Sequence, residues 1–255
     1  MEIIQLILAA IILVTIYKKM LKWGNADGLS KKQKYVPIGL GILSVIVSFL
    51  FVAGIALFSV KVLGFHLDEI ENQSLRAAVK AFTMAGLTEE IAKLLMIILS
   101  IKLFSPKRVY EYTLIGAAVG IGFTIHEELL YGGSIAGLLR FITVAMHMVL
   151  GIIMGKNLGI GKYNIANGLS HKAAYLKAVL IPMIIHTLFD ACTIFNPVAN
   201  MAEELEADDF IALAWLSIGI LAIISAAIYQ FVVLKNIKKE AEKQSNMLVV
   251  NLPDT

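Results

Sequence analysis

Seven runs of apolar residues, each close to the length that crosses a lipid bilayer, constrain this chain more than any other feature. A spanning helix needs about 20 apolar residues, with roughly 17 to 25 tolerated. Only 16% of the 255 residues are charged, against about 25% in ordinary soluble domains. The sequence therefore predicts an all-α, polytopic membrane helix bundle and argues against a water-soluble enzyme, and the single cysteine argues against a disulfide scaffold. The seven runs are Ile3–Tyr17, Val36–Val60, Ala78–Phe104, Tyr112–Tyr131, Ile135–Gly155, Leu176–Phe195 and Phe210–Leu234.

The loops between these runs predict the orientation of the chain. Lysine and arginine gather after the first, third, fifth and seventh runs, while the intervening loops are acidic or neutral. Because basic loops stay on the cytoplasmic side, we expect the N-terminus outside and the C-terminus in the cytoplasm. We expect residues 1–234 to form one transmembrane domain and residues 235–255 a cytoplasmic polar tail. Topology already accounts for the basic loops, so no nucleic-acid partner is predicted.

Ten ionisable side chains lie inside four neighbouring runs, whereas the first, second and seventh runs have none in their cores apart from tyrosine. Each charge at mid-bilayer costs about 2.5 to 3.5 kcal/mol on insertion scales. We therefore expect these side chains to face one another inside the bundle, in the outer half of the membrane. They are Glu89, Glu90, Lys93, His126, Glu127, Glu128, Arg140, His147, His186 and Asp190.

Helical spacing supports this convergence. Residues four apart share one face of a helix, and small residues at that spacing allow two helices to approach closely. Three pairs of residues that share a helical face in this way are Glu89 with Lys93, Phe123 with Glu127, and His186 with Asp190. The glycines whose spacing allows two helices to approach closely are Gly116, Gly120, Gly151 and Gly155.

Carboxylates and histidines held together out of water suit two related kinds of chemistry. They bind a divalent metal, or they act as acid and base on a water molecule. A water activated by Glu89 with a histidine or a metal could attack a peptide carbonyl. His186 or Asp190 could then hold the developing oxyanion or orient its donor. The zinc-protease motif HExxH is absent, because Leu130 stands where its second histidine must be.

Four ordered motifs resemble those of the PrsW-type intramembrane protease family. Glu89-Glu90-Ile91-Ala92-Lys93 is similar to its EExxK motif, and Gly120 to Phe123, continuing to Glu127 and Tyr131, is similar to its GxGFxxxENxxY motif. His147 and the segment from His186 to Asp190 resemble the later single histidine and the HxxxN/D motif. The resemblance covers Lys80–Ile194, inside an expected catalytic core of residues 78–195. The wider superfamily includes CAAX prenyl proteases and bacteriocin-processing or self-immunity proteins.

The resemblance implies an endopeptidase in a bacterial-type cell (plasma) membrane that cuts a membrane-anchored protein. In the family's best-known role this substrate is an anti-sigma factor, cut on the extracytoplasmic side to start a stress response. The expected catalytic residues are Glu89, Glu90, Glu127, His147, His186 and Asp190, with Lys93, Phe123 and Glu128 in support. A divalent metal, zinc by expectation, would be held by Glu127, His147 and His186, but glutamate-dependent and metal-independent members are also described. Glu128 replaces the asparagine of the family motif.

Other interpretations stay open at this stage. Glu89 and Glu90 could form a buried structural ion pair with Lys93 or Arg140. The same side chains could relay protons or carry a divalent ion in a transporter, although no inverted repeat supports this. A scaffold or immunity protein could bind a partner without cleaving it. The sequence leaves the oligomeric state open.

Overall fold

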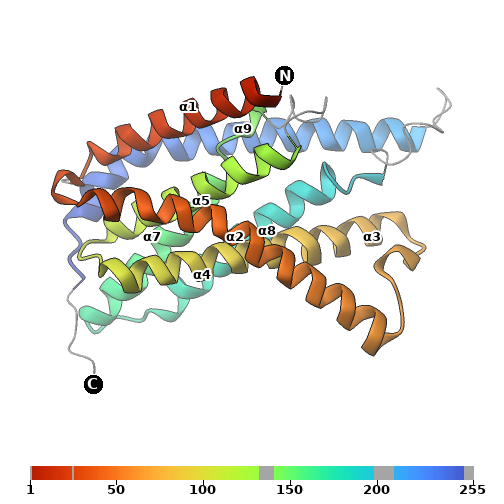
Figure 1. The fold of residues 1–255 in the computed structure, drawn as a ribbon, viewed down its shortest axis with the longest axis horizontal. Helices are drawn as coiled ribbons and strands as arrows, with labels where there is room; N and C mark the ends of the chain where they lie inside the picture. Colours follow the sequence, from red (N-terminus) through yellow and green to blue (C-terminus); the bar gives the residue numbers. More distant parts are fainter. Residues whose placement is uncertain (1, 25, 132–140, 198–209, 250–255) are drawn as a thin grey trace.

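The fold is all-helical in the computed structural model, which describes residues 2–24, 26–131, 141–197 and 210–249 (Figure 1). Within these residues there is no β-strand, only an isolated antiparallel bridge between Arg108 and Leu248. This confirms the predicted fold class. The α-helices are α1 (Glu2–Leu21), α2 (Lys31–Phe58), α3 (Gln73–Lys80), α4 (Leu87–Phe104), α5 (Val109–Tyr131), α7 (Met146–Ala166), α8 (Lys172–Cys192) and α9 (Phe210–Ser245). Short 3₁₀ segments are η1 (Ala26–Gly28) and η3 (Leu67–Glu69), and π-helical segments are η2 (Ser59–Leu63) and η4 (Ala81–Gly86).

Five of the described helices are long and apolar enough to cross a membrane, so the chain is a multi-pass membrane protein. They cover Ile3–Leu21, Lys31–Leu63, Val109–Leu130, Lys172–Cys192 and Leu213–Ser245. The third predicted run is an uninterrupted helical stretch through α3, η4 and α4, and it carries the charges of the site. The fifth predicted run begins among residues 132–140, outside the described part, and continues as α7. The count of seven spans and the orientation stay predictions.

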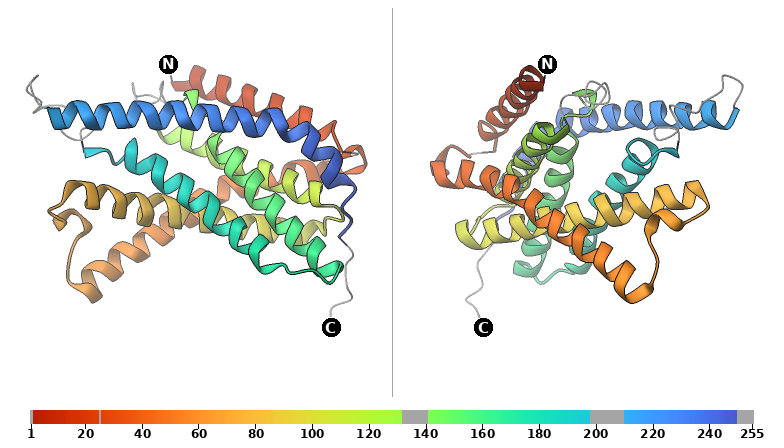
Figure 2. Two further views of the ribbon diagram at one scale, coloured as in Figure 1. Left: turned by 180° about the vertical axis from the view of Figure 1, so that it is seen from behind. Right: turned by 45° about the vertical axis from the view of Figure 1, so that its right-hand side comes forward.

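Helix α5 is the centre of the bundle, and its glycines bring two neighbouring helices against it (Figure 2). A Cβ atom on Gly116 would lie 2.0 Å from the backbone oxygen of Gly151 in α7, and one on Gly120 would lie 2.2 Å from that of His147. On another side, a Cβ atom on Gly122 would lie 1.9 Å from the backbone oxygen of Ile38 in α2. No real Cβ atom fits at such distances, so α5, α7 and α2 pack backbone to backbone. The predicted role of the small residues is confirmed.

The π-helical segment η4 leads directly into the glutamate pair of α4. Its last residue, Gly86, lies against α8: a Cβ atom there would be 1.9 Å from Thr187 Oγ1 and 3.0 Å from the backbone oxygen of Met183. Single π-helical turns inside helices are frequent at functional sites. This glycine lets α8 approach the start of α4, which is where the site forms.

Helix α9 continues through the first half of the predicted polar tail and lies along the same side of the bundle as α1 (Figure 1). Its buried side chains beyond residue 234 include Ile237, Ala241 and Gln244. Gln244 accepts a hydrogen bond from Thr113 of α5 at 2.6 Å. The segment up to Val249 therefore packs on the bundle, and residues 250–255 lie outside the described part.

Candidate functional site

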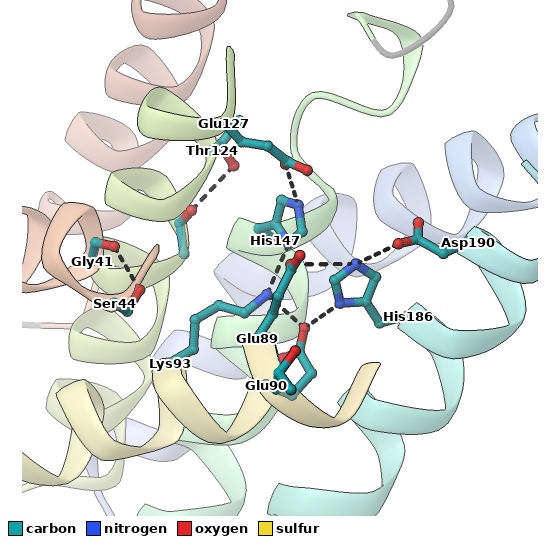
Figure 3. A network of polar contacts seen from close by, with 12 residues as sticks. Gly41, Ser44, Glu89, Glu90, Lys93, Thr124, Glu127, His147, His186 and Asp190 are labelled. Atoms are coloured by element: carbon teal, nitrogen blue, oxygen red, sulfur yellow. Dashed lines mark hydrogen bonds and ion pairs between the residues drawn. The ribbon is translucent and has the colours of Figure 1, made fainter. Parts of the chain in front are cut away.

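The ionisable side chains of four helices meet where α5 and α8 end and α4 and α7 begin (Figure 3). The lysine-rich turn that follows α1 lies at the other end of α5, where Tyr110 donates a hydrogen bond to the backbone oxygen of Met20. The members of the cluster are Glu89, Glu90 and Lys93 from α4, Glu127 from α5, His147 from α7, and His186 and Asp190 from α8. The structure thus brings together all six residues predicted as catalytic and the supporting Lys93.

Glu90 anchors the centre of this cluster through one carboxylate oxygen. Its Oε1 lies 2.5 Å from Lys93 Nζ and 2.7 Å from His186 Nδ1. Glu90 is 1% exposed and Lys93 is fully buried. An ionised carboxylate only accepts hydrogen bonds, so His186 donates from Nδ1. The sequence placed Lys93 on the face of Glu89, but its ion pair is with Glu90, three residues before it.

His147 connects this ion pair to α5. Its Nδ1 lies 2.8 Å from Lys93 Nζ, and its Nε2 lies 2.6 Å from Glu127 Oε2. An ammonium group has donors only, so Nδ1 accepts and Nε2–H donates to Glu127. The two contacts fix one tautomer of the ring. Phe123, predicted as a supporting residue, packs on His147 with ring centroids 4.7 Å apart and lies 4.2 Å below Lys93 Nζ.

Glu89 has a different environment from its neighbour. Its Oε2 is buried and has no hydrogen-bond partner. The nearest nitrogen of the cluster is His186 Nε2, at 3.7 Å, and the same nitrogen lies 3.4 Å from Asp190 Oδ2. Buried polar atoms without a partner are uncommon, so this oxygen marks a place where a proton, a water molecule or a ligand is expected.

Three residues of the cluster could hold a metal ion. Glu89, His147 and His186 each offer one donor atom, and the three atoms lie within 4.8 Å of one another. Two imidazoles and one carboxylate are a donor set that suits catalytic zinc. The Glu89 oxygen that makes no hydrogen bond also fits a cation ligand. The predicted set had Glu127 in place of Glu89; here Glu127 contacts His147 Nε2, and its role as a ligand stays a prediction.

A pocket opens beside the cluster between the ends of α5 and α8 and the start of α7. Its lining residues are Thr124, Glu127, Glu128, Thr143, Val144, Met146, His147, His186, Phe189, Asp190 and Ile194.

Glu128, the remaining predicted supporting residue, is buried, and its carboxylate lies 3.5 Å from Gln5 Nε2 of α1. The buried Nδ1 of His126 has no hydrogen-bond partner. Arg140 and the side chain of Tyr131 lie outside the described residues.

Sequence reasoning missed two contributions to this site, and both come from amides. Gln5 reaches Glu128 from α1, and Gln230 of α9 bonds to the turn that precedes α7. A search for ionisable residues in apolar runs passes over amides, although these are also costly in lipid unless they are hydrogen-bonded. The sequence feature that could have revealed both residues is a glutamine within an otherwise apolar run.

The helical fold and the buried glutamate–histidine cluster define an integral membrane protein with a candidate metal centre inside its bundle. Residues 36–224, well over half of the chain, match the family model described as PrsW family intramembrane metalloprotease. The chain belongs to this family, and it is accordingly a protease, that is, a hydrolase. No curated protein and no solved structure matches it.

Proposed function

We propose that this protein is an intramembrane endopeptidase that cleaves a membrane-anchored protein with a water molecule activated at Glu89. The observation that carries this proposal is the buried Glu89 Oε2, which has no hydrogen-bond partner and lies 3.7 Å from His186 Nε2. A general base needs a free lone pair next to a group that receives or stabilises charge. Family membership favours peptide hydrolysis over ion transport for this cluster.

Each of the other residues has a distinct proposed part in the reaction. Glu89 accepts the proton of the attacking water. His186, oriented by Glu90 through Nδ1 and by Asp190 near Nε2, stabilises the oxyanion and afterwards assists the leaving amine. Lys93 offsets the charge of Glu90 and orients His147. Glu127 accepts a hydrogen bond from Nε2–H of His147 and so orients the same ring.

Glu89, His147 and His186 would hold a divalent metal, and zinc is the ion we propose. Because Nδ1 of His186 is bonded to Glu90, its Nε2 would be the metal donor, so the oxyanion stabilisation assigned to His186 applies to the metal-free form. Such an ion supplies Lewis acidity toward the scissile carbonyl and favours the ionisation of water. Both ring nitrogens of His147 are already in contact, with Lys93 and with Glu127. Binding through this ring therefore replaces one of those contacts, and Glu127 is the partner nearer the pocket, whose lining includes it.

The proposed substrate is a protein anchored by a single transmembrane helix, and an anti-sigma factor is the specific candidate. The cluster lies toward the C-terminal end of α5, whereas the lysine-rich turn that follows α1 lies at the start of α5, which supports cleavage toward the extracytoplasmic side of a bacterial plasma membrane. Seven spans with the N-terminus outside remain part of the proposal.

The test is a reconstitution of the purified full chain in lipid vesicles with candidate single-span substrates. Wild type is compared with Glu89→Gln and with Glu242→Gln, an exposed glutamate of α9 that serves as the matched control. We expect wild type and Glu242→Gln to release the same fragment and Glu89→Gln to release none.

Two results would overturn the proposal. One is an absence of cleavage by wild type across a panel of single-span substrates. The other is cleavage by Glu89→Gln at the wild-type rate. Cleavage that survives chelation, together with no bound metal by elemental analysis, would remove the metal from the proposal and leave the glutamate base.

A further inference from the structure

The backbone turn before His147 is held by a side chain from another helix. Gln230 of α9 accepts a hydrogen bond from the backbone N–H of Ala145 at 3.1 Å. Its Nε2 donates to the backbone oxygen of Ile142 at 2.5 Å. Gln230 is only 8% exposed. One buried amide thus binds both ends of the turn from Ile142 to Ala145.

The N-cap position of α7 has no capping side chain of its own. Ala145 is the N-cap residue of α7, and its side chain makes no capping hydrogen bond. An alanine cannot satisfy the free N–H groups at a helix start, and in lipid such groups find no water. Gln230 supplies a partner from outside α7 to one N–H group at this helix start, that of Ala145. His147 is the second residue of α7, so the position of its ring depends on how this helix begins.

Apolar contacts also join α9 to the start of α7. Ala226, one helical turn before Gln230, packs with Met146 and Leu150 of α7, and Ile185 and Phe189 of α8 pack against that group. Because residues four apart share one helical face, Ala226 and Gln230 form a single contact surface on the start of α7. Most of the other side chains in this part of α9 are exposed. Gln230 is therefore the polar centre of an otherwise apolar contact.

We propose that Gln230 is a positioning residue for His147, and that α9 sets the catalytic geometry through this hydrogen-bonded turn. Gln230 lies beyond residues 36–224, so the family match does not include it. The proposal rests on the proposed function for its kinetic consequence. The position of the His147 ring can be measured without any activity.

The experiment uses the full chain in lipid nanodiscs with ¹⁵N-labelled histidine. The imidazole resonances of His147 are identified by their loss in His147→Ala. Gln230→Met keeps the length of the side chain and removes both hydrogen bonds. Gln230→Glu keeps an acceptor for Ala145 N–H. The matched control is Gln244→Met, which removes another buried, hydrogen-bonded glutamine of α9 about 21 Å further along the helix.

We expect Gln230→Met to shift the His147 resonances and to lower kcat by about 10- to 100-fold, because small displacements of catalytic groups are costly. Gln230→Glu is expected to recover part of this loss. Gln244→Met is expected to leave both the resonances and kcat as in wild type, even where it lowers thermal stability.

The proposal is wrong if folded Gln230→Met keeps wild-type His147 resonances, or if Gln244→Met shifts them equally. Should Gln230→Met not fold, the same comparison is made with Gln230→Glu, whose unchanged resonances and kcat would overturn the proposal. If wild type cleaves no substrate, the proposed function fails, and the resonances still decide the role of Gln230.

Discussion

His186 Nδ1 lies 2.7 Å from Glu90 Oε1, although the two residues are 96 positions apart in the chain. The same oxygen binds Lys93 at 2.5 Å. Glu89, the adjacent residue, keeps an oxygen without a hydrogen bond. Both glutamates keep a buried Oε2 without a hydrogen bond. Glu90 holds Lys93 and His186 through its Oε1, whereas Glu89 Oε2 lies 3.7 Å from His186 Nε2, so the two neighbours differ in how tightly they are held.

This division predicts different effects for the same substitution at the two positions. Glu89→Gln is expected to lower cleavage by about 10²- to 10⁴-fold, the usual contribution of a general base. Its stability should stay within about 1 kcal/mol of wild type, because Glu89 Oε2 has no hydrogen bond to lose. Glu90→Gln should destabilise the fold by roughly 3–5 kcal/mol, because it leaves the buried Lys93 ammonium without its counter-charge. Unfolding and cleavage assays on both variants check this, and equal stability of the two would contradict it.

The ion pair between Glu90 and Lys93 predicts coupling between their substitutions. Lys93→Met alone should destabilise the protein, because a buried carboxylate loses its ammonium partner. The double variant Glu90→Gln/Lys93→Met removes both charges and should recover much of the stability. Cleavage should not recover, since His147 loses its contact with Lys93 and His186 loses the negative charge of the carboxylate that accepts from it. A double-mutant cycle measures the coupling, and strictly additive free energies of unfolding would show that the pair does not act as a unit.

Much of this site could be predicted because a charge inside an apolar run is visible in the sequence and costly in the membrane. The cost of these charges is enough to predict that Glu89, Glu127 and His186 lie in one cluster. It does not decide which glutamate pairs with Lys93, because residues three and four apart lie on nearly the same helical face. The observed choice of Glu90 depends on how α4 is rotated, and α4 continues from the π-helical segment η4.

The fold was also predictable in part, because side chains inside a membrane must be apolar and small residues let helices pack closely. Apolar runs show where helices lie, and the glycine spacing predicted close helix approach in the fourth and fifth runs. The structure shows that these two helices approach each other, at Gly116 and Gly151. The docking of α9 was not predicted. It depends on the amide of Gln230 and on the packing of Ala226, and neither carries a charge that would stand out in an apolar run.

Close packing at Gly120 gives a prediction that separates helix packing from helix propensity. A Cβ atom on Gly120 would lie 2.2 Å from the backbone oxygen of His147, whereas one on Gly39 of α2 would meet nothing within 4 Å. Gly120→Ala should cost about 1–3 kcal/mol of stability and reduce cleavage, because α7 has to move at His147. Gly39→Ala, the matched control, should be neutral or stabilising by up to about 1 kcal/mol. Thermal unfolding and cleavage rates test both, and a harmless Gly120→Ala would show that α5 and α7 pack less tightly than the structure has them.

The identity of the metal ligands gives the last prediction, because sequence and structure favour different carboxylates. The donor atoms of Glu89, His147 and His186 lie within 4.8 Å of one another, and Glu127 instead contacts His147 Nε2. On this geometry, Glu89→Gln and His186→Ala should lose the metal, while Glu127→Gln should weaken binding by about 10- to 100-fold, as substitutions of residues that orient a ligand do. Zinc content and affinity are measured on purified protein after chelation and reloading, with Glu242→Gln as the control. Zinc retained by Glu89→Gln but lost by Glu127→Gln would instead support the ligand set expected from the sequence.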